Sequence, residues 1–323
     1  MYILLEVLKS IFPIVAIVTI GYLLGQKSWF KASFSGDISK LIMKIALPAS
    51  IFTSVVSRLT ASQLAMFAEG LLISGAAVAI SYLAAFLLVK ACRIRPGRRG
   101  IFINAVANAN TIFIGMPLNI ALFGSKSMDY FLVYYVVNTI STWAFGAFLI
   151  TNDPMEATET KRKKDLGEIL KKIFSLPLVA FLIAISLVLL KVKVPAEILA
   201  CTQYLGNLVT PLALIYIGLV LNKAGLKSLR FDRDTNLALA GKFLIAPAAM
   251  IGMLLATKHF GLFLPAAERN TLIMQSAVPA LTVLPVLADD GKGDVNYATN
   301  IVALSTILFV VAAPIAMLVI NAL

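Results

Sequence analysis

The sequence predicts an all-α polytopic membrane protein of ten transmembrane helices, and two observations carry this prediction. Hydrophobic residues make up 60% and charged residues 14% of the 323 residues, whereas an average soluble protein has roughly 45–50% and about 25%. Apolar runs of about twenty residues, enough to cross a hydrocarbon core of roughly 30 Å, recur along the whole chain. We therefore expect the lipid bilayer to surround the protein and no sizeable soluble domain.

Charged residues, glycines and prolines separate the apolar runs and set the expected helix boundaries. Residues 1–25 are interpreted as the first span and not as a signal peptide, because Glu6 and Lys9 interrupt the usual pattern of such a peptide. The expected helices cover residues 3–25, 36–57, 62–90, 97–124, 127–151, 171–190, 197–222, 234–257, 266–288 and 295–321.

The basic residues predict the orientation of these helices. Most of the 28 Lys and Arg residues fall in the odd-numbered loops, and basic loops stay on the cytoplasmic side of a membrane. We therefore expect a multi-pass protein of the cell's inner (cytoplasmic) membrane with both termini external. The net charge of +12 follows from this loop pattern and does not indicate nucleic-acid binding.

A polar stretch at residues 152–170 divides the chain into two halves, residues 1–151 and 171–323, with five expected helices each. It is interpreted as a cytoplasmic linker. Because five is odd, the second half enters the membrane from the other side, and inverted repeats of this kind are typical of secondary transporters. Matched proline spacing supports the duplication. The matched prolines are Pro13, Pro48 and Pro117 in the first half and Pro177, Pro211 and Pro279, or Pro285 in place of Pro279, in the second.

The fourth helix of each half carries polar side chains next to helix breakers at mid-span depth. Proline removes a backbone donor, so it is expected where a helix is kinked or broken. Freed amides and half-helix ends can bind a substrate without side-chain ions. Alternatively, the prolines only kink packed helices and the amides join neighbouring helices. The candidate binding residues are Asn108, Asn110, Thr111, Gly115, Gln275, Ser276 and Thr282, with Pro117, Pro279 and Pro285 as helix breakers.

One basic residue, Lys242, lies deep in the eighth expected helix. It is a further binding candidate, because a buried charge in a membrane span needs a reason to be there. It could face a cavity and attract an anion, neutralise the carbonyl ends of broken helices, or snorkel to the interface. Away from helix ends no span contains Asp or Glu, although cation exchangers and proton relays use buried carboxylates. This charge pattern suits an anionic ligand.

Other functional classes have little support in the residues. With His259 as its one histidine, the chain offers neither a His-rich metal site nor the usual base of a hydrolytic triad. No cofactor is expected. Cys92 and Cys201 fall on opposite sides of the predicted membrane, so they are not expected to form a disulfide. An enzyme or a receptor is therefore a remote alternative.

Motifs along nearly the whole chain resemble the auxin efflux carrier family, which includes the plant PIN proteins and bacterial malate and malonate permeases. The string NTIFIGMPL, which starts at Asn110, is the most specific, and ALFG follows it. ALPASIF, TPLALIYIGL and SAVPALTVLPVLADDG in the second, seventh and ninth helices add to it. The short central linker makes the chain similar to the bacterial branch. The plant members have a proline where this chain has Ala109, which leaves the local helix break open.

The resemblance implies a fold and a function. The first, second, sixth and seventh helices would form a scaffold and homodimerise, and helices 3–5 and 8–10 would form a transport bundle. The fourth and ninth helices would cross at their breaks, and small organic anions such as malate or malonate would move there by an elevator-type shift. The alternative is a sodium-coupled symporter of the bile-acid-carrier type; coupling to sodium or to protons is left open.

Overall fold

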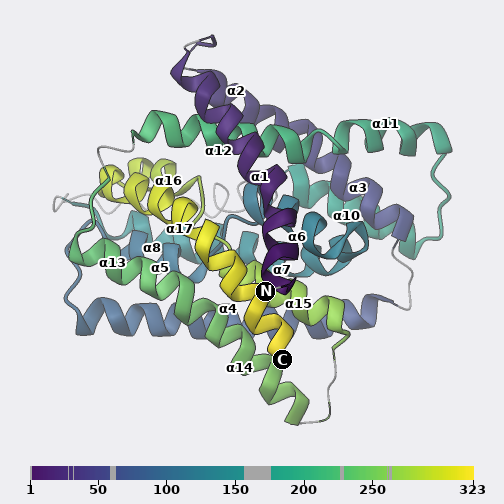
Figure 1. Cartoon of the computed structure of the whole chain (residues 1–323). Helices are drawn as coiled ribbons and strands as arrows, with labels where there is room; N and C mark the ends of the chain where they lie inside the picture. The colour runs from purple at the N-terminus through teal and green to yellow at the C-terminus, as the bar shows by residue number, and fades with distance from the viewer. Residues whose placement is uncertain are drawn as a thin grey trace.

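A computed structural model gives the fold of the chain (Figure 1). Within the described residues every regular element is a helix, which confirms the predicted all-helical class. The structure describes residues 2–27, 29–31, 33–58, 63–155, 176–225, 229–259, 261 and 264–323.

The helices of the first half follow the expected order, although several are interrupted. The labels η1, η2 and η4 mark π-helical turns within longer helices, and η3 is a short 3₁₀ turn. The elements are α1 (Tyr2–Gln26), α2 (Phe34–Leu41), η1 (Ile42–Ala46), α3 (Leu47–Arg58), α4 (Gln63–Ala91), α5 (Arg99–Ala107), η2 (Thr111–Gly115), α6 (Met116–Phe123), η3 (Ser125–Ser127), α7 (Met128–Ile140), η4 (Ser141–Gly146) and α8 (Ala147–Thr151).

The second half also contains interrupted helices, and the π-helical turn η6 lies within one of them. Most of the linker predicted at 152–170, and the start of the next expected helix, lie outside the described residues. The elements are α10 (Leu176–Leu189), α11 (Ala196–Gly206), α12 (Val209–Ala224), α13 (Arg233–Ala240), η6 (Gly241–Ile245), α14 (Ala246–His259), α15 (Ala266–Ala277), α16 (Leu284–Asp290) and α17 (Val295–Ala322).

Several helical segments are long and apolar enough to cross a membrane. This agrees with a multi-pass membrane protein. Shorter apolar helices occur at Ala16–Gln26, Val179–Leu189 and Leu214–Lys223, so the count of ten spans and the inverted relation of the halves stay predictions. The six long segments among the described residues are Phe34–Ser57, Ala68–Ala91, Arg99–Phe123, Ser125–Thr151, Arg233–His259 and Val295–Ala322.

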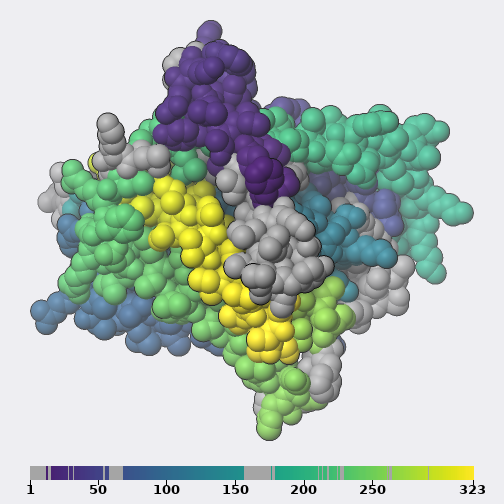
Figure 2. All heavy atoms as spheres, viewed as in Figure 1, coloured from purple at the N-terminus to yellow at the C-terminus, as the bar shows by residue number. Residues whose placement is uncertain are grey.

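The outer surface of the long helices is apolar. On α17, the yellow helix along the face in Figure 2, Val310, Val311 and Ile315 are exposed. On α4, Leu72 and Leu83 are exposed as well. Side chains of this kind on the outside of long helices suit contact with lipid, since in water they would form an unfavourable apolar surface.

Two groups of helices pack among themselves. In the first group α1 lies along α12, and α10 and α11 lie on α3. Gly21 and Gly218 allow the contact of α1 with α12, because a Cβ at either residue would collide with the backbone of the facing helix. In the second group α4 packs against α5, α7 and α14, and α15 packs against α7, α14 and α17. The first group holds the first, second, sixth and seventh expected helices.

The segment Arg99–Phe123 forms the centre of the second group. Within its most apolar window 94% of the residues are buried, against 39% for Ala68–Ala91. A helix surrounded by other helices has no lipid to face, so its polar side chains must find partners inside the protein. The candidate binding residues of the fourth helix are therefore interior residues.

Candidate functional site

Two broken helices meet at the centre of the second group. Helix α5 ends at Ala107, and the chain continues in extended form through Asn108, which has φ −107° and ψ 158°. Helix α15 ends at Ala277 in the same way, and Val278 is also extended. The backbone N–H of Asn110 donates to the carbonyl oxygen of Pro279 at 2.8 Å. The breaks of the fourth and ninth expected helices are therefore in direct contact.

Polar side chains from two other helices hold the extended segments. Asn138 of α7 accepts the N–H of Ala109 at 2.8 Å and donates to the Ala109 carbonyl at 3.0 Å. Ser305 of α17 accepts the N–H of Ala280 at 3.2 Å. These side chains replace the backbone partners that an unbroken helix would supply. The break at Ala109 thus forms without a proline.

The three prolines predicted as helix breakers have different positions. Pro279 lies inside the extended segment, so it marks the break of the ninth helix. Pro285 lies in the first turn of α16, where the missing N–H would have no partner within the helix anyway. Pro117 lies where the π-helical turn η2 passes into α6, after the start of this helical segment at Thr111. The crossing is formed by Ala109 and Pro279. Pro285 lies at the start of the half-helix that follows the break of the ninth helix, whereas Pro117 lies inside the half-helix that Asn110 caps. Their role at the crossing stays a prediction.

The side chain of Asn108 is fully used inside the protein. Its Nδ2 donates to the Tyr82 hydroxyl at 2.5 Å and to the Asn104 Oδ1 at 2.8 Å. Its Oδ1 accepts the Ser141 hydroxyl at 2.5 Å. Asn108 therefore ties α5 to α4 and η4.

Lys242 is fully buried in η6, at 0% exposure. Its Nζ donates to the backbone carbonyl of Asn108 at 3.0 Å. This carbonyl belongs to the C-terminal end of the half-helix α5, where the helix dipole is negative. Of the three readings of Lys242, the geometry matches the one in which its ammonium group neutralises the carbonyl end of a broken helix, and it does not snorkel.

Two amide side chains at the crossing keep an unpartnered atom. Asn110 caps the helix that follows it through its Oδ1, which accepts the N–H of Phe113 at 3.3 Å, while its Nδ2 has no partner. Gln275 donates to the carbonyl of Gly115 at 2.9 Å, while its Oε1 has no partner. A Cβ on Gly115 would collide with Gln275 Oε1, so glycine permits this contact. One donor and one acceptor thus remain at the crossing.

The other candidate residues are less open to a ligand. Ser276 Oγ donates to the carbonyl of Ile273 in its own helix at 2.7 Å. Thr111 Oγ1 lies 3.5 Å from Nδ2 of Asn138. Thr282 is half-buried in the linker between α15 and α16, and its side chain bonds to that of Tyr216 on α12. Thr282 therefore connects the segment between α15 and α16 to the first group of helices.

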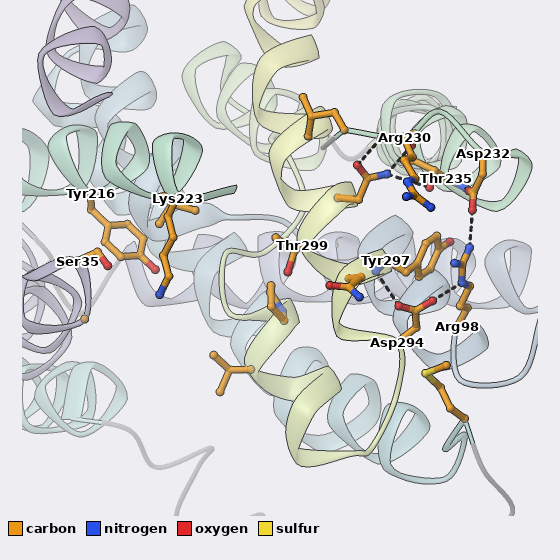
Figure 3. Close-up of a pocket in the computed structure, with 18 of the residues that line it drawn as sticks. Ser35, Arg98, Tyr216, Lys223, Arg230, Asp232, Thr235, Asp294, Tyr297 and Thr299 are labelled. Atoms are coloured by element: carbon orange, nitrogen blue, oxygen red, sulfur yellow. Dashed lines mark hydrogen bonds and ion pairs between the residues drawn. The ribbon is translucent and has the colours of Figure 1, made fainter. Parts of the chain in front are cut away.

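A cavity of about 1110 Å³ lies between the two groups of helices. Figure 3 shows Ser35, Tyr216 and Lys223 on one side of it and Arg98, Asp294 and other polar residues on the other. Pro285, in the first turn of α16, also lines the cavity. The cavity thus reaches the half-helix that begins after the break of the ninth helix.

Sequence reasoning missed an ion-pair cluster on the wall of this cavity. Arg98 binds Asp232 at 2.6 Å and Asp294 at 2.7 Å, and its guanidinium lies 4.5 Å from the centre of the Tyr297 ring. Asp232 and Asp294 are N-cap residues, whose carboxylates accept the N–H of Thr235 and of Tyr297. An aspartate directly before a helix-forming run was the signal available in the sequence.

The ion pairs shift the pKa values of this cluster, which lies at helix ends outside the spans. Burial favours the neutral form of Asp232, but hydrogen bonds from Arg98 and Thr235 outweigh it and hold its pKa well below the usual range. Burial likewise opposes the charge of Arg98, but Asp232 and Asp294 raise its pKa above its ordinary value. The cluster therefore stays ionised and joins the N-terminal ends of α5, α13 and α17.

Comparison with known proteins finds relatives that cover nearly the whole chain. The chain is 24% identical to an uncharacterized transporter of Methanothermobacter thermautotrophicus, with 95% of this chain and 96% of the relative covered. It is 22% identical to the uncharacterized transporter MJ1031 of Methanocaldococcus jannaschii, with 91% and 92% covered. It is also 22% identical to the uncharacterized transporter YfdV of Escherichia coli, with 95% of each chain covered.

A family model described as membrane transport protein matches residues 6–317. This match accords with the expectation that the chain is not an enzyme, and it does not support the bile-acid-carrier alternative. Because the match spans nearly the whole chain, the protein belongs to this family of membrane transporters, the auxin efflux carrier family that its motifs resemble.

Proposed function

We propose that this protein is a secondary active transporter of small organic anions, with dicarboxylates such as malate or malonate as the expected substrates. The observation that carries the proposal is the crossing itself. Lys242 brings a positive charge to the end of α5 at the crossing, and Asn110, which caps the half-helix that follows, keeps a free donor. Half-helix N-termini and a buried cation favour an anionic ligand, as in other transporters with broken helices.

The cavity supports the proposal by its charge. Among the described residues, Lys223 and Arg230 line it without an ion pair, whereas its half-buried acidic residues Asp232 and Asp294 are held by Arg98. Unpaired basic residues at the mouth of a cavity raise the local concentration of anions. An organic acid would enter past these residues and reach the crossing beside Pro285.

The packing suggests how the anion would move. The group containing α1, α3, α10 and α12 would be the scaffold and the dimer interface, and the group containing the crossing would be the transport bundle. An elevator-type shift of the bundle along the scaffold would carry the crossing from one side of the inner membrane to the other, with both termini external. The two halves would be repeats, because each places its broken helix fourth. The repeats would be inverted, because each half has five expected helices, an odd number.

Reconstitution tests the proposal directly. Purified protein in liposomes would be given radiolabelled malate, malonate, succinate and a monocarboxylate, each with and without an unlabelled internal pool. We expect saturable uptake of at least one dicarboxylate, and an unlabelled internal pool should increase this uptake. Protein-free liposomes and liposomes containing the Lys242→Ala variant are the controls. The proposal is refuted if liposomes with folded protein take up every acid no faster than protein-free liposomes.

A further inference from the structure

Glu268, in the first turn of α15, is a buried carboxyl group without a partner. The residue is 1% exposed, and neither Oε1 nor Oε2 has a hydrogen-bond partner in the described part of the chain. It fills the space beside Gly70 of α4, where a Cβ would collide with Oε1, and Val133 of α7 lies at the same place. Neither Gly70 nor Val133 offers this carboxyl group a side-chain hydrogen-bond partner.

The charges around Glu268 do not compensate an ionised carboxylate. Glu69 on α4 acts on it by like-charge repulsion. The guanidinium of Arg269, its neighbour on α15, binds Asn270 and the carbonyl of Leu323 instead. Among described residues no ion pair joins Glu268 to a cation. The other titratable groups on the elements packed against α15 are Asp129, Tyr130, Tyr134 and Tyr135 of α7, Lys126 of η3, Lys242 of η6, Lys258 and His259 of α14, and Tyr297 of α17.

Unpartnered oxygen atoms occur along the face of α15 between Glu268 and the crossing. Glu268, Thr271 and Gln275 are spaced i, i+3 and i+7, so they share one face of α15. All three are buried, and Thr271 Oγ1 and Gln275 Oε1 also have no partner. Ser74, one turn after Gly70 on α4, is buried with an unpartnered Oγ as well. Buried polar atoms normally have partners, so this repeated exception on one face indicates a path for a small polar species.

An unpaired carboxylate is far more costly to bury than a neutral carboxylic acid, and the buried acid therefore takes up a proton. A hard metal cation would instead need several oxygen ligands. The described residues contain no group of three or more His, Cys, Asp or Glu side chains that could hold one. The chemistry of the site thus favours a proton.

We propose that Glu268 is a proton-binding site of the transport bundle and that its proton moves in the same direction as the organic anion, an inference that rests on the proposed function. Binding forms an O–H bond on the Glu268 carboxylate, and release returns the same proton to water. Figure 1 shows α15 and α16 at opposite ends of the broken helix, with the cavity beside α16. Glu268 thus lies at the end away from the cavity, and Thr271 and Gln275 link it to the crossing.

Infrared spectroscopy tests proton binding without any substrate. Purified protein is titrated from alkaline to acidic pH, and the carbonyl stretch of a protonated carboxyl group in an apolar site is followed. We expect one such band in the wild-type protein that Glu268→Gln removes. The control Glu197→Gln replaces an exposed glutamate in the first turn of α11 and should leave the band unchanged. A band that is absent from the wild-type protein, or that persists in Glu268→Gln, would overturn the proposal.

Transport in liposomes tests the coupling. The membrane potential is held at zero, and the outside is made one pH unit more acidic than the liposome interior. Such a gradient can drive about tenfold accumulation of the anion inside the liposomes for each coupled proton. We expect wild type and Glu197→Gln to accumulate labelled malate or malonate under this gradient. Glu268→Gln, which resembles the protonated state, should retain exchange of internal for external substrate and lose gradient-driven accumulation.

Three outcomes would overturn the coupling. One is unchanged accumulation by Glu268→Gln. Another is wild-type accumulation that a sodium gradient drives and a pH gradient does not, which would assign the site to sodium. The third is a wild-type protein that transports no acid of the panel, which would refute the proposed function and the coupling together. Even then, the infrared band would decide whether Glu268 binds a proton.

Discussion

The backbone N–H of Asn110 donates to the carbonyl of Pro279 at 2.8 Å, and this bond joins two helices at the residues where each is broken. A helix break leaves backbone donors and acceptors without their usual partners, and such groups are costly in the membrane interior. The contact satisfies one pair of them. It also fixes Asn110 and Gln275 at the same crossing, each with one unpartnered side-chain atom.

Asn110→Ala and Gln275→Ala should each weaken substrate binding. A hydrogen bond to a charged group is worth about 1.5–3 kcal/mol, so we expect the affinity to fall by about tenfold to a hundredfold. Protein yield should stay nearly intact, and the melting temperature should fall less than for Asn108→Ala, because each of these side chains makes one hydrogen bond within the protein and keeps another atom without a partner. Ligand-binding titration and a thermal melt of each variant provide the two measurements.

Asn108→Ala is the matched control, because all bonds of this side chain are made within the protein. We expect this variant to lose stability. If Asn110→Ala and Gln275→Ala instead lower the melting temperature with unaltered affinity, these residues only join helices and the crossing is not the binding site.

Lys242→Ala should weaken anion binding, and Lys242→Arg should restore part of it. The charge of Lys242 lies at the carbonyl end of α5, so its loss removes the cation nearest the crossing. Arginine keeps the charge but is larger, and a fully buried site accepts extra volume poorly. Lys258→Ala, an exposed lysine on the helix that continues from η6, is the control. Unchanged affinity in both Lys242 variants would leave Lys242 a purely structural role.

The sequence predicted the helical class, the approximate helix boundaries and the two helices that are broken, because apolar run length and prolines are local signals. Asn110 and Pro279 were among its candidates, but it left the break at Ala109 open. Ala109 has no intrinsic tendency to break a helix, and the extended conformation depends on Asn138 from another helix. Contacts between distant segments of this kind leave no local signal.

The burial of Glu268 was also beyond sequence reasoning. A glutamate near the start of an apolar segment reads as an interfacial residue, since helix ends commonly face water. Gly70 of α4 leaves room for the carboxyl group, and Val133 of α7 lies beside the same place. A residue's depth in a bundle depends on how neighbouring helices extend past it, and a single segment does not encode this.

Asn138→Ala should destabilise the fold. The substitution leaves both backbone groups of Ala109 buried without partners, and each buried unsatisfied group costs about 1–3 kcal/mol. We expect a lower melting temperature and a higher rate of proteolysis near residue 109. Asn152→Ala is the control, because Asn152 is exposed and donates only to the carbonyl of Phe148. Equal melting temperatures for the two variants would show that Asn138 does not hold the break.

Acid should destabilise the protein through Asp232. Its pKa in the folded protein is held below its ordinary value, so its ion pair with Arg98 stabilises the fold above that value, about 3.9, and the contribution is lost as the pH falls below it. Asp232→Asn should therefore have a lower melting temperature at neutral pH and a smaller decrease on acidification.

The control for this pH series is Asp37→Asn. Asp37 pairs with Lys40 at 3.5 Å, and both side chains are mostly exposed, so the pair should contribute little. We expect its melting curves to follow the wild type across the series. Parallel curves for wild type and Asp232→Asn would contradict a stabilising role of the Asp232–Arg98 pair.

The side of the membrane on which the cavity opens can be determined by cysteine labelling. The basic loops predict that residues 152–170 are cytoplasmic, and Lys126, an exposed residue between α6 and α7, is predicted to be external. In a variant without Cys92 and Cys201, a cysteine replacing Thr158 should react with a membrane-impermeant thiol reagent only after the cells are permeabilised. A cysteine replacing Lys126 should react in intact cells.

The cavity residues Arg98, Asp232 and Asp294 lie in or beside basic odd-numbered loops, so this labelling pattern would place the cavity on the cytoplasmic side. The opposite labelling pattern would reverse the orientation of the protein and place Glu268 at the cytoplasmic end of the bundle.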